Sequence, residues 1–161
     1  MFSKKIIIGC DNAAVELKDI VKELLQNHGI EVEDIGVNTS NDTTMYPDIA
    51  AKLCTKIQES NFENRGILLC GTGIGMAMMA NKFEGIYAAV CHDNFAVERS
   101  VLSNDGNVLC LGARIVGAEL AKKIVKEWIN LEYKVSKSQD KIDRMREIEK
   151  LNFTKTATQE A

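Results

Sequence analysis

The sequence has little proline, tryptophan or histidine: its 161 residues include one proline, one tryptophan and two histidines. It also lacks a long apolar run, because stretches such as residues 6–8 and 85–91 fall far short of the roughly 20 apolar residues that a membrane-spanning helix needs. Neither sign of charge dominates, and the net charge is only −3. These absences argue against a membrane protein and against nucleic acid as the main partner, whereas a small anion needs only local cations and amides.

The cysteines show neither a zinc pattern nor a disulfide framework. Their number is odd and no pair is spaced as CxxC; the five are Cys10, Cys54, Cys70, Cys91 and Cys110. Free thiols suit a reducing compartment, and the first five residues do not resemble a secretory signal. We therefore expect a cytoplasmic protein whose length suits a single domain.

Apolar runs of strand length alternate with helical patterns along most of the chain. The predicted strands are residues 5–9, 31–35, 66–70, 86–91 and 107–111. The predicted helices include residues 14–28, a segment beginning near Pro47, one reaching residue 82, and residues 92–102, 115–130 and 140–151. Leu120, Ile124 and Trp128 are expected to face inward. This alternation predicts a three-layer α/β/α domain with a five-stranded parallel sheet.

Right-handed crossovers would bring the carboxyl ends of all the strands to one edge, where such sheets bind ligands. That edge would carry residues 10–12, 70–72, 91–93 and 111–114. We expect residues 1–150 to form the domain, with the arm and helix of residues 131–151 packed on a partner subunit. Residues 152–161 are polar and without pattern, so we expect a frayed tail.

The strongest local motif is Cys70-Gly71-Thr72-Gly73-Ile74-Gly75. It is not a dinucleotide fingerprint, which needs glycine where Met76 stands, and it has no GK[ST] of a P-loop. Three alternating glycines between strand and helix can turn several N–H groups toward one point. Such a nest can bind a phosphate or the oxyanion of an enediolate, while the alternative interpretation is a tight turn alone.

Several side chains near this edge have both a functional and a structural interpretation. Cys70 lies at a helix N-terminus that favours a thiolate base, but a free cysteine is more commonly a small core residue. Asp11 could bind sugar hydroxyls or cap the next helix, and Tyr46 could line a ligand or pack on its loop. His92 is interpreted as a polar residue at a strand end. The candidate phosphate ligands are Arg114, Lys137 and Lys141, each of which could also be a solvated cation.

Taken in order, the motifs of this chain resemble the ribose-5-phosphate isomerase B family, which includes galactose-6-phosphate isomerase subunits and allose-6-phosphate isomerases. The resemblance covers about residues 4–150. The matching segments are residues 9–11, 46–47, 70–75, 80–82, 91–93, 104–108 and 112–117. It implies a Rossmann-like sheet, active sites between two subunits of a dimer, and no metal or organic cofactor.

The resemblance also assigns roles. Cys70 would be the base that moves a proton between C1 and C2, with Asn104 assisting from the partner subunit. Backbone amides would stabilise the enediolate at Gly71, Gly73 and Gly75. The sugar would be held, and its ring opened, by Asp11, Tyr46 and Thr72. A base, an oxyanion nest and a phosphate grip are what proton abstraction beside a carbonyl requires.

Four positions depart from the family pattern. Asn12 stands where the family has a histidine that contacts phosphate, and Ser103 stands where it has the histidine implicated in ring opening. Lys137 and Lys141 replace phosphate-binding arginines of the C-terminal arm. Serine is not a useful acid or base near neutral pH, and lysine lacks the bidentate fork of arginine.

Three interpretations remain open at this point. The chain could be a ribose-5-phosphate isomerase with weakened ring opening, or an isomerase of galactose 6-phosphate or allose 6-phosphate. It could also be a sugar-phosphate-binding protein without turnover. We expect a homodimer or homotetramer, with a hetero-oligomer as the alternative.

Overall fold

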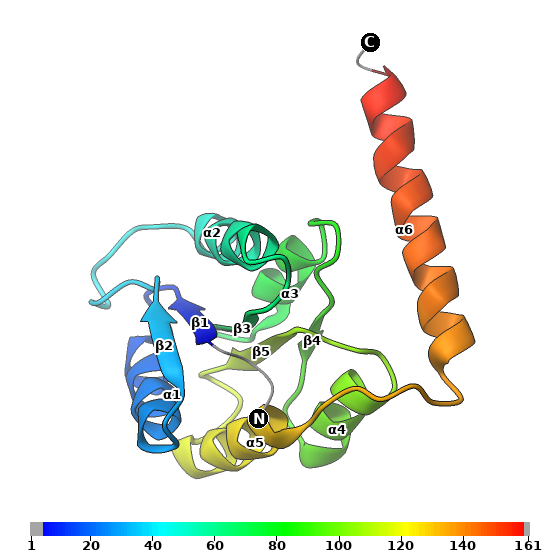
Figure 1. Cartoon of the computed structure of the whole chain (residues 1–161). Coiled ribbons are helices and arrows are strands. Elements are labelled where there is room, and N and C mark those ends of the chain that lie inside the picture. The colour runs from blue at the N-terminus through cyan, green and yellow to red at the C-terminus, as the bar shows by residue number, and fades with distance from the viewer. Residues whose placement is uncertain (1–4, 160–161) are drawn as a thin grey trace.

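The computed structural model describes residues 5–159, with side chains described for residues 5–154. Strands and helices alternate through this range, as the sequence predicts (Figure 1). The elements are β1 (Lys5–Cys10), α1 (Val15–Asn27), β2 (Glu31–Asp34), α2 (Tyr46–Glu59), β3 (Arg65–Cys70), α3 (Ile74–Ala80), β4 (Ala88–Val90), α4 (Asn94–Leu102), β5 (Val108–Gly112), α5 (Ala118–Asn130) and α6 (Gln139–Gln159).

The five strands form one parallel sheet in the order β2-β1-β3-β5-β4. In its register Cys10 lies opposite Leu69, and Cys70 lies opposite Gly112. The carboxyl ends of β1, β3 and β5 are therefore neighbours, and the loops that follow them meet at one edge. The predicted parallel sheet of five strands is confirmed.

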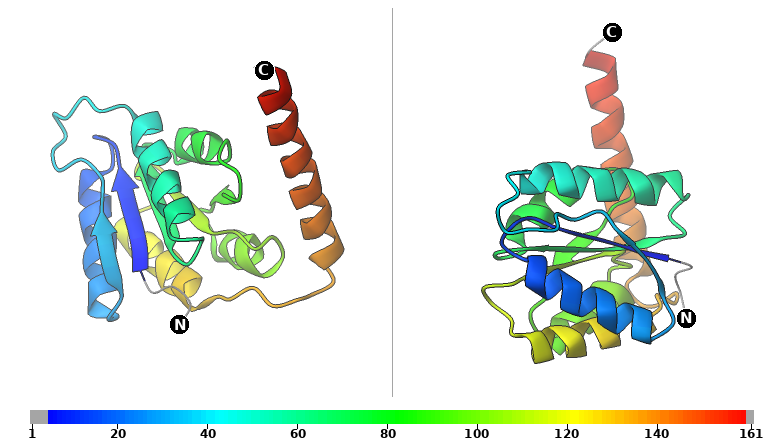
Figure 2. Two further views of the ribbon diagram at one scale, coloured as in Figure 1. Left: turned by 45° about the horizontal axis from the view of Figure 1, so that its top comes forward. Right: turned by 90° about the vertical axis from the view of Figure 1, so that its left-hand side faces the viewer.

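Helices cover both faces of the sheet (Figure 2). On one face α2 packs over β1 and β3, and α3 packs beside it over β3, β5 and β4; on the other face α5 packs against α1 and α4. α2 approaches β3 so closely that a Cβ on Gly66 would lie 2.5 Å from Leu53 Cδ2. Ile124 and Trp128 are buried as expected, and the strands are almost continuously apolar and buried. The predicted three-layer α/β/α architecture is confirmed.

Some element boundaries and one core residue differ from the prediction. β4 has only three residues, and α4 begins at Asn94 because the Asp93 carboxylate accepts a hydrogen bond from the Ala96 N–H over 2.8 Å. α5 begins at Ala118 rather than at residue 115. Leu120 is 39% exposed, so the prediction that it faces inward is wrong.

α6 stands away from the body of the domain, at the end of the extended arm formed by residues 131–138 (Figure 1). It touches the body through Arg146, which pairs with Asp105, and through Glu149, which accepts a hydrogen bond from Tyr87 Oη over 2.7 Å. The helix continues to Gln159, past residue 151 where we expected it to end. Its exposed apolar side chains include Ile148 and Leu151.

No helix within residues 5–159 is long and apolar enough to cross a membrane. Even α6, with 21 residues, does not combine the length and apolar character that a bilayer span requires.

Candidate active site

The loop between β3 and α3 holds the Cys70 sulfur against a backbone amide. β3 ends at Cys70, and Gly73 takes a left-handed conformation with φ 76° as the N-cap of α3. The Gly73 N–H thereby points back at the strand and donates a hydrogen bond to Cys70 Sγ over 3.1 Å. A Cβ on Gly73 would be strained and would lie 3.0 Å from the Leu111 backbone. Glycine at position 73 is thus needed to build a donor for this sulfur.

All five cysteines are buried, and burial shifts the pKa values of the other four. Burial raises the pKa of Cys10 and of Cys54 to about 12. It also raises the pKa values of Cys91 and Cys110, which lie in the same core. Burial thus favours the protonated thiol at these four positions. Cys70 is itself only 6% exposed, and it differs from them in accepting the hydrogen bond from the Gly73 N–H.

Tyr46 lies directly against the helical side of the same loop. It is the first residue of α2, with Pro47 in the first turn as predicted. A Cβ on Gly75 would lie 2.7 Å from Tyr46 Cε2 and Cζ, so only glycine leaves room for the ring. Tyr46 is 41% exposed. Its ring therefore lines the loop and still faces the space outside it.

Arg114 brings a positive charge to the other side of the loop. The residues that follow β5 stay hydrogen-bonded to the residues that end and follow β3. The Ala113 N–H donates to Cys70 O over 2.8 Å, and the Arg114 N–H donates to Gly71 O over 3.0 Å. The guanidinium lies over Gly71, with Nε 3.4 Å from where a Cβ would be. An exposed arginine beside backbone amides can bind a phosphate or a developing oxyanion.

His92 and Gly112 complete the support of this loop, and the sequence interpretation gave His92 no role. His92 Nε2 accepts a hydrogen bond from the Gly112 N–H over 3.0 Å. Gly112 passes so close to Thr72 that a Cβ would lie 2.7 Å from its Cα. Burial lowers the pKa of His92, although Asp93 acts in the opposite direction. A neutral imidazole is the form that can accept this hydrogen bond.

Asp11 and Asn12 lie one strand away from Cys70. The Asp11 N–H donates to Leu69 O over 3.3 Å, and Asp11 Oδ1 accepts from the Ala13 N–H over 3.0 Å. Asp11 therefore closes a turn and does not cap α1, whose N-cap is Ala14. Asn12 is exposed beside it.

The remaining predicted residues form a second group at the opposite edge of the sheet. α4 runs back from the carboxyl end of β4, so Ser103 and Asn104 lie beside the amino ends of the strands. Ser103 and Lys137 line one hollow between α4 and the arm, while Lys141 is exposed on the first turn of α6. With about 3.3 Å per residue, β3 separates the two edges by more than about 15 Å. The structure thus gathers the predicted site residues into two groups rather than one.

Within the described residues, no cluster of three or more His, Cys, Asp or Glu side chains is arranged to hold a metal ion. The group at the carboxyl ends of the strands, here called the carboxyl-edge group, instead offers the Cys70 sulfur, backbone amides of the loop, the Tyr46 phenol ring and the Arg114 guanidinium. Those groups on a parallel α/β sheet suit a sugar-phosphate isomerase, since proton transfer beside a carbonyl needs a base and an oxyanion site.

Comparison with known proteins agrees with this class. The profile of the Ribose/Galactose Isomerase family matches residues 6–145, and the chain belongs to that family. Among solved structures, a ribose-5-phosphate isomerase B of Clostridium thermocellum superimposes with a TM-score of 0.86 at 36% identity, covering 92% of this chain and 99% of the other. The Mycoplasma genitalium enzyme with bound ribulose-5-phosphate gives a TM-score of 0.87 at 32% identity, covering 93% and 99%.

Curated relatives carry the names of different sugar phosphates. A D-erythrulose-4-phosphate isomerase of Mycolicibacterium smegmatis is 46% identical over 131 residues, which are 80% of this chain and 86% of the relative. One from Pectobacterium atrosepticum is 42% identical over 140 residues, 87% and 91% of the two chains. A ribose-5-P isomerase B of Listeria innocua is 40% identical over 148 residues, 92% and 99%. The chain is therefore a sugar-phosphate isomerase of this family.

Proposed function

We propose that the chain interconverts D-erythrulose 4-phosphate and D-erythrose 4-phosphate. Two of the relatives described above are named for erythrulose 4-phosphate, at 46% and 42% identity. The observation that carries the proposal is Ser103, which occupies the position of the ring-opening histidine in the family that the sequence resembles.

Ring chemistry explains why serine suits a four-carbon substrate. An aldose closes a furanose ring through the hydroxyl on C4, and in erythrose 4-phosphate that oxygen carries the phosphate. The substrate is therefore open-chain, so a general acid–base group for ring opening has nothing to act on. Ribose 5-phosphate keeps its C4 hydroxyl and cyclises, so an enzyme without that group would lose about 10²- to 10⁴-fold in the ring-opening step.

The carboxyl-edge group supplies the isomerisation itself. The Cys70 thiolate, held by the Gly73 N–H over 3.1 Å, removes a proton from C1 of the ketose. The electron pair forms the C1–C2 double bond and leaves an enediolate whose oxyanion faces the loop amides and Arg114. Cys70 returns the proton to C2 while the O1 proton passes to O2, directly or by way of Asp11 or Thr72. Atoms balance without a cofactor.

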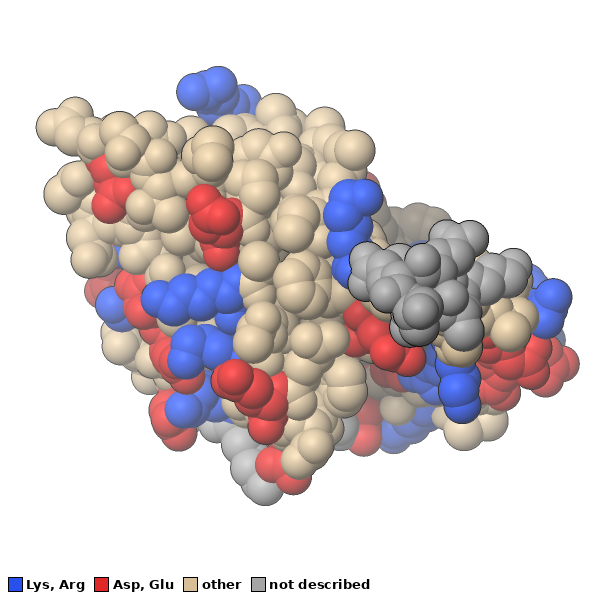
Figure 3. Space-filling view, turned by 90° about the horizontal axis from the view of Figure 1, so that it is seen from above, with Lys and Arg blue, Asp and Glu red and all other residues tan. Residues whose placement is uncertain are grey.

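The two groups of site residues would meet only between subunits. One substrate cannot reach both edges of a single chain, since the sheet separates them by more than about 15 Å. A homodimer in which one chain supplies the carboxyl edge and its partner the amino edge would assemble the whole site. Ile74 and Met78 on α3 are 52% and 66% exposed beside the loop, and Figure 3 shows a broad uncharged surface on the side of α2 and α3. Such a surface suits a subunit contact.

Ribose 5-phosphate is the second candidate, supported by the 40% identity to the Listeria innocua ribose-5-P isomerase B over nearly its whole length. It would require the remaining groups, Asp11 and Thr72, to open the ring slowly. The six-carbon substrates and a binding protein without turnover are further outcomes that the same assay detects.

The test compares kcat/KM of the purified protein on erythrulose 4-phosphate, ribose 5-phosphate, allose 6-phosphate and galactose 6-phosphate. We expect the four-carbon sugar to be preferred at least tenfold, and Ser103→His to shift the ratio toward ribose 5-phosphate. Gln26→His, on the exposed surface of α1 and away from both groups of site residues, is the control. A wild-type preference for ribose 5-phosphate or a six-carbon sugar would refute the proposal.

A further inference from the structure

A hollow of about 430 Å³ lies between the end of α4 and the arm that leads to α6. Its charged lining consists of three cations and one carboxylate: Arg99, Lys134, Lys137 and Glu132. The whole chain carries a net charge of −3, so this local excess of positive charge runs against the average of the molecule. Ser103, Ser136 and Ser138 add hydroxyl groups to the same lining. Cations with hydroxyl donors form a setting for a phosphate group.

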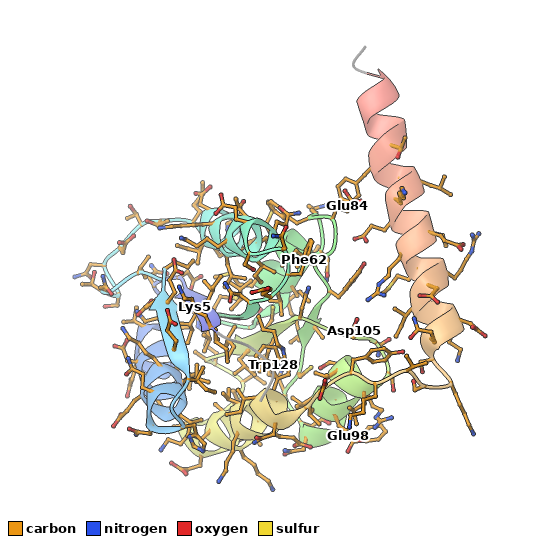
Figure 4. All side chains as sticks on the ribbon, viewed as in Figure 1. Lys5, Phe62, Glu84, Glu98, Asp105 and Trp128 are labelled. Atoms are coloured by element: carbon orange, nitrogen blue, oxygen red, sulfur yellow. The ribbon has the colours of Figure 1, made fainter. Side chains whose placement is uncertain are left out.

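Arg99 holds both of the residues that the resemblance places in the partner's active site. Its Nη1 donates a hydrogen bond to Ser103 Oγ over 3.1 Å, and its carbonyl oxygen accepts one from Asn104 Nδ2 over 2.9 Å. The other terminal nitrogen, Nη2, pairs with Glu98. Figure 4 labels Glu98 on α4 and Asp105 in the loop after it, on the part of the body nearest the arm and α6.

The guanidinium also has unused donor capacity. Arg99 Nε is buried without a hydrogen-bond partner among the described residues, while the side chain as a whole is 40% exposed. A longer side chain at position 103 would collide with Nη1, which lies 3.1 Å from Ser103 Oγ. The small serine and the position of Arg99 therefore depend on each other.

We propose that Arg99 is a specificity-determining residue that binds the phosphate of the four-carbon substrate in this hollow. The inference rests on the proposed function and on a second subunit that brings the hollow to Cys70. A phosphate on C4 lies one carbon nearer to the reacting C1 and C2 than a phosphate on C5. Arg99 lies on α4 one helical turn from Ser103, whereas the lysines of the hollow come from the arm. A guanidinium can bind phosphate at two points, which Lys137 cannot; here Nη1 and Nη2 would turn from Ser103 and Glu98 to the phosphate.

The test separates phosphate binding from a structural role by using erythrulose 4-phosphate and unphosphorylated erythrulose side by side. We expect Arg99→Met to lower kcat/KM on the phosphate ester about 10- to 100-fold, because a charge-assisted bidentate contact is lost. On unphosphorylated erythrulose the variant should match the wild type. Arg99→Lys should fall between the two on the ester. Arg144→Met, an arginine of α6 outside the hollow, should change neither substrate.

Equal losses on both sugars would overturn the proposal, since they would mark the Arg99 side chain as a support for Ser103 only. A second measurement keeps the inference separate from the proposed function. Inorganic phosphate should raise the melting temperature of the wild type, and Arg99→Met should abolish most of that rise. If the wild type fails to convert any four-carbon sugar phosphate, the proposed function is refuted. The phosphate-induced rise in melting temperature then tests by itself whether Arg99 binds phosphate. A phosphate-induced rise that persists in Arg99→Met would refute it.

Discussion

Tyr46 contacts Gly75, and replacing Gly75 by alanine should affect stability and substrate binding in opposite directions. A Cβ at position 75 would lie 2.7 Å from the Tyr46 ring, which is 41% exposed and free to swing outward. Alanine also favours the helix by up to about 1 kcal/mol over glycine. We expect Gly75→Ala to keep or raise the melting temperature while KM for the sugar phosphate rises several-fold.

A double-mutant cycle checks the cause. Tyr46→Ala should raise KM by a similar factor, and Gly75→Ala should add nothing in the Tyr46→Ala background. Additive effects would show that Gly75 acts through something other than the tyrosine ring.

His92 should make stability depend on pH. Burial lowers its pKa in the folded protein, so the unfolded chain binds more protons than the native state just below pH 6.5. The hydrogen bond from Gly112 is therefore fully available above about pH 6.5 and is lost as the pH falls through the lowered pKa. We expect the free energy of unfolding to decline between pH 7.5 and 5.5, and His92→Gln to flatten that decline. An unchanged slope in the variant would contradict this account.

At the residue scale, the sequence could reveal residues whose role follows from local pattern. The turn that follows Cys70 was predictable because alternating glycines after a strand dictate a local turn. His92 was not, since its partner Gly112 lies on a different strand and the two meet only through the sheet order β5-β4. The sequence alone likewise shows Arg99 only as a cation on a helix. Its place in the hollow becomes visible when the structure puts the arm beside α4.

At the scale of elements, a buried charge pair fixes α1 to β2 and to the loop after it. Lys18 is 1% exposed, and its Nζ lies 3.0 Å both from Asp34 Oδ2 and from Val37 O. Lys22 pairs with the same carboxylate over 2.9 Å. We expect Asp34→Asn to cost roughly 3 kcal/mol of unfolding free energy, because it leaves the buried Lys18 with only the exposed Asp19 carboxylate, 3.5 Å away, as a counter-ion.

Urea denaturation measures this cost, and Glu31→Gln is the matched control. Glu31 pairs with Lys5 over 3.1 Å but is 66% exposed, so its loss should cost less than about 1 kcal/mol. A similar small effect for both variants would show that the Lys18–Asp34 pair contributes no more than a surface pair.

The order and type of the elements were predictable, and their ends were less so. Apolar runs and helical spacing identify buried strands and amphipathic helices, as at Ile124 and Trp128. Leu120 has the same spacing but lies in the first turn of α5, where its side chain is 39% exposed. The position of the arm, residues 131–138, could not be predicted from the sequence, because it has no periodic pattern of apolar residues that would indicate a packing partner.

At the scale of the whole molecule, the separation of the two residue groups predicts complementation between inactive subunits. Cys70→Ala should disable the carboxyl edge and Asn104→Ala the amino edge. In a mixed dimer, one site would combine the intact edges of the two chains. We expect unfolding and refolding an equal mixture to restore up to about a quarter of wild-type activity, from half the dimers with one good site each.

Each variant refolded alone provides the baseline for this experiment. Recovery no greater than the sum of the two baselines would place Cys70 and Asn104 in separate functions or within one chain. Sedimentation of the wild type should show a dimer or a multiple of it.

The most direct test of the central claim measures turnover of erythrulose 4-phosphate by the wild type, Cys70→Ala and Cys54→Ala. Cys54 is a buried cysteine on α2 whose thiol donates a hydrogen bond to Ala80 O, so it controls for loss of a core sulfur. We predict that Cys70→Ala lowers kcat by at least about 10²- to 10⁴-fold while product still binds, and that Cys54→Ala keeps kcat near the wild-type value. Turnover by Cys70→Ala at the wild-type rate would contradict the account, because the proton would then move without the sulfur held by Gly73.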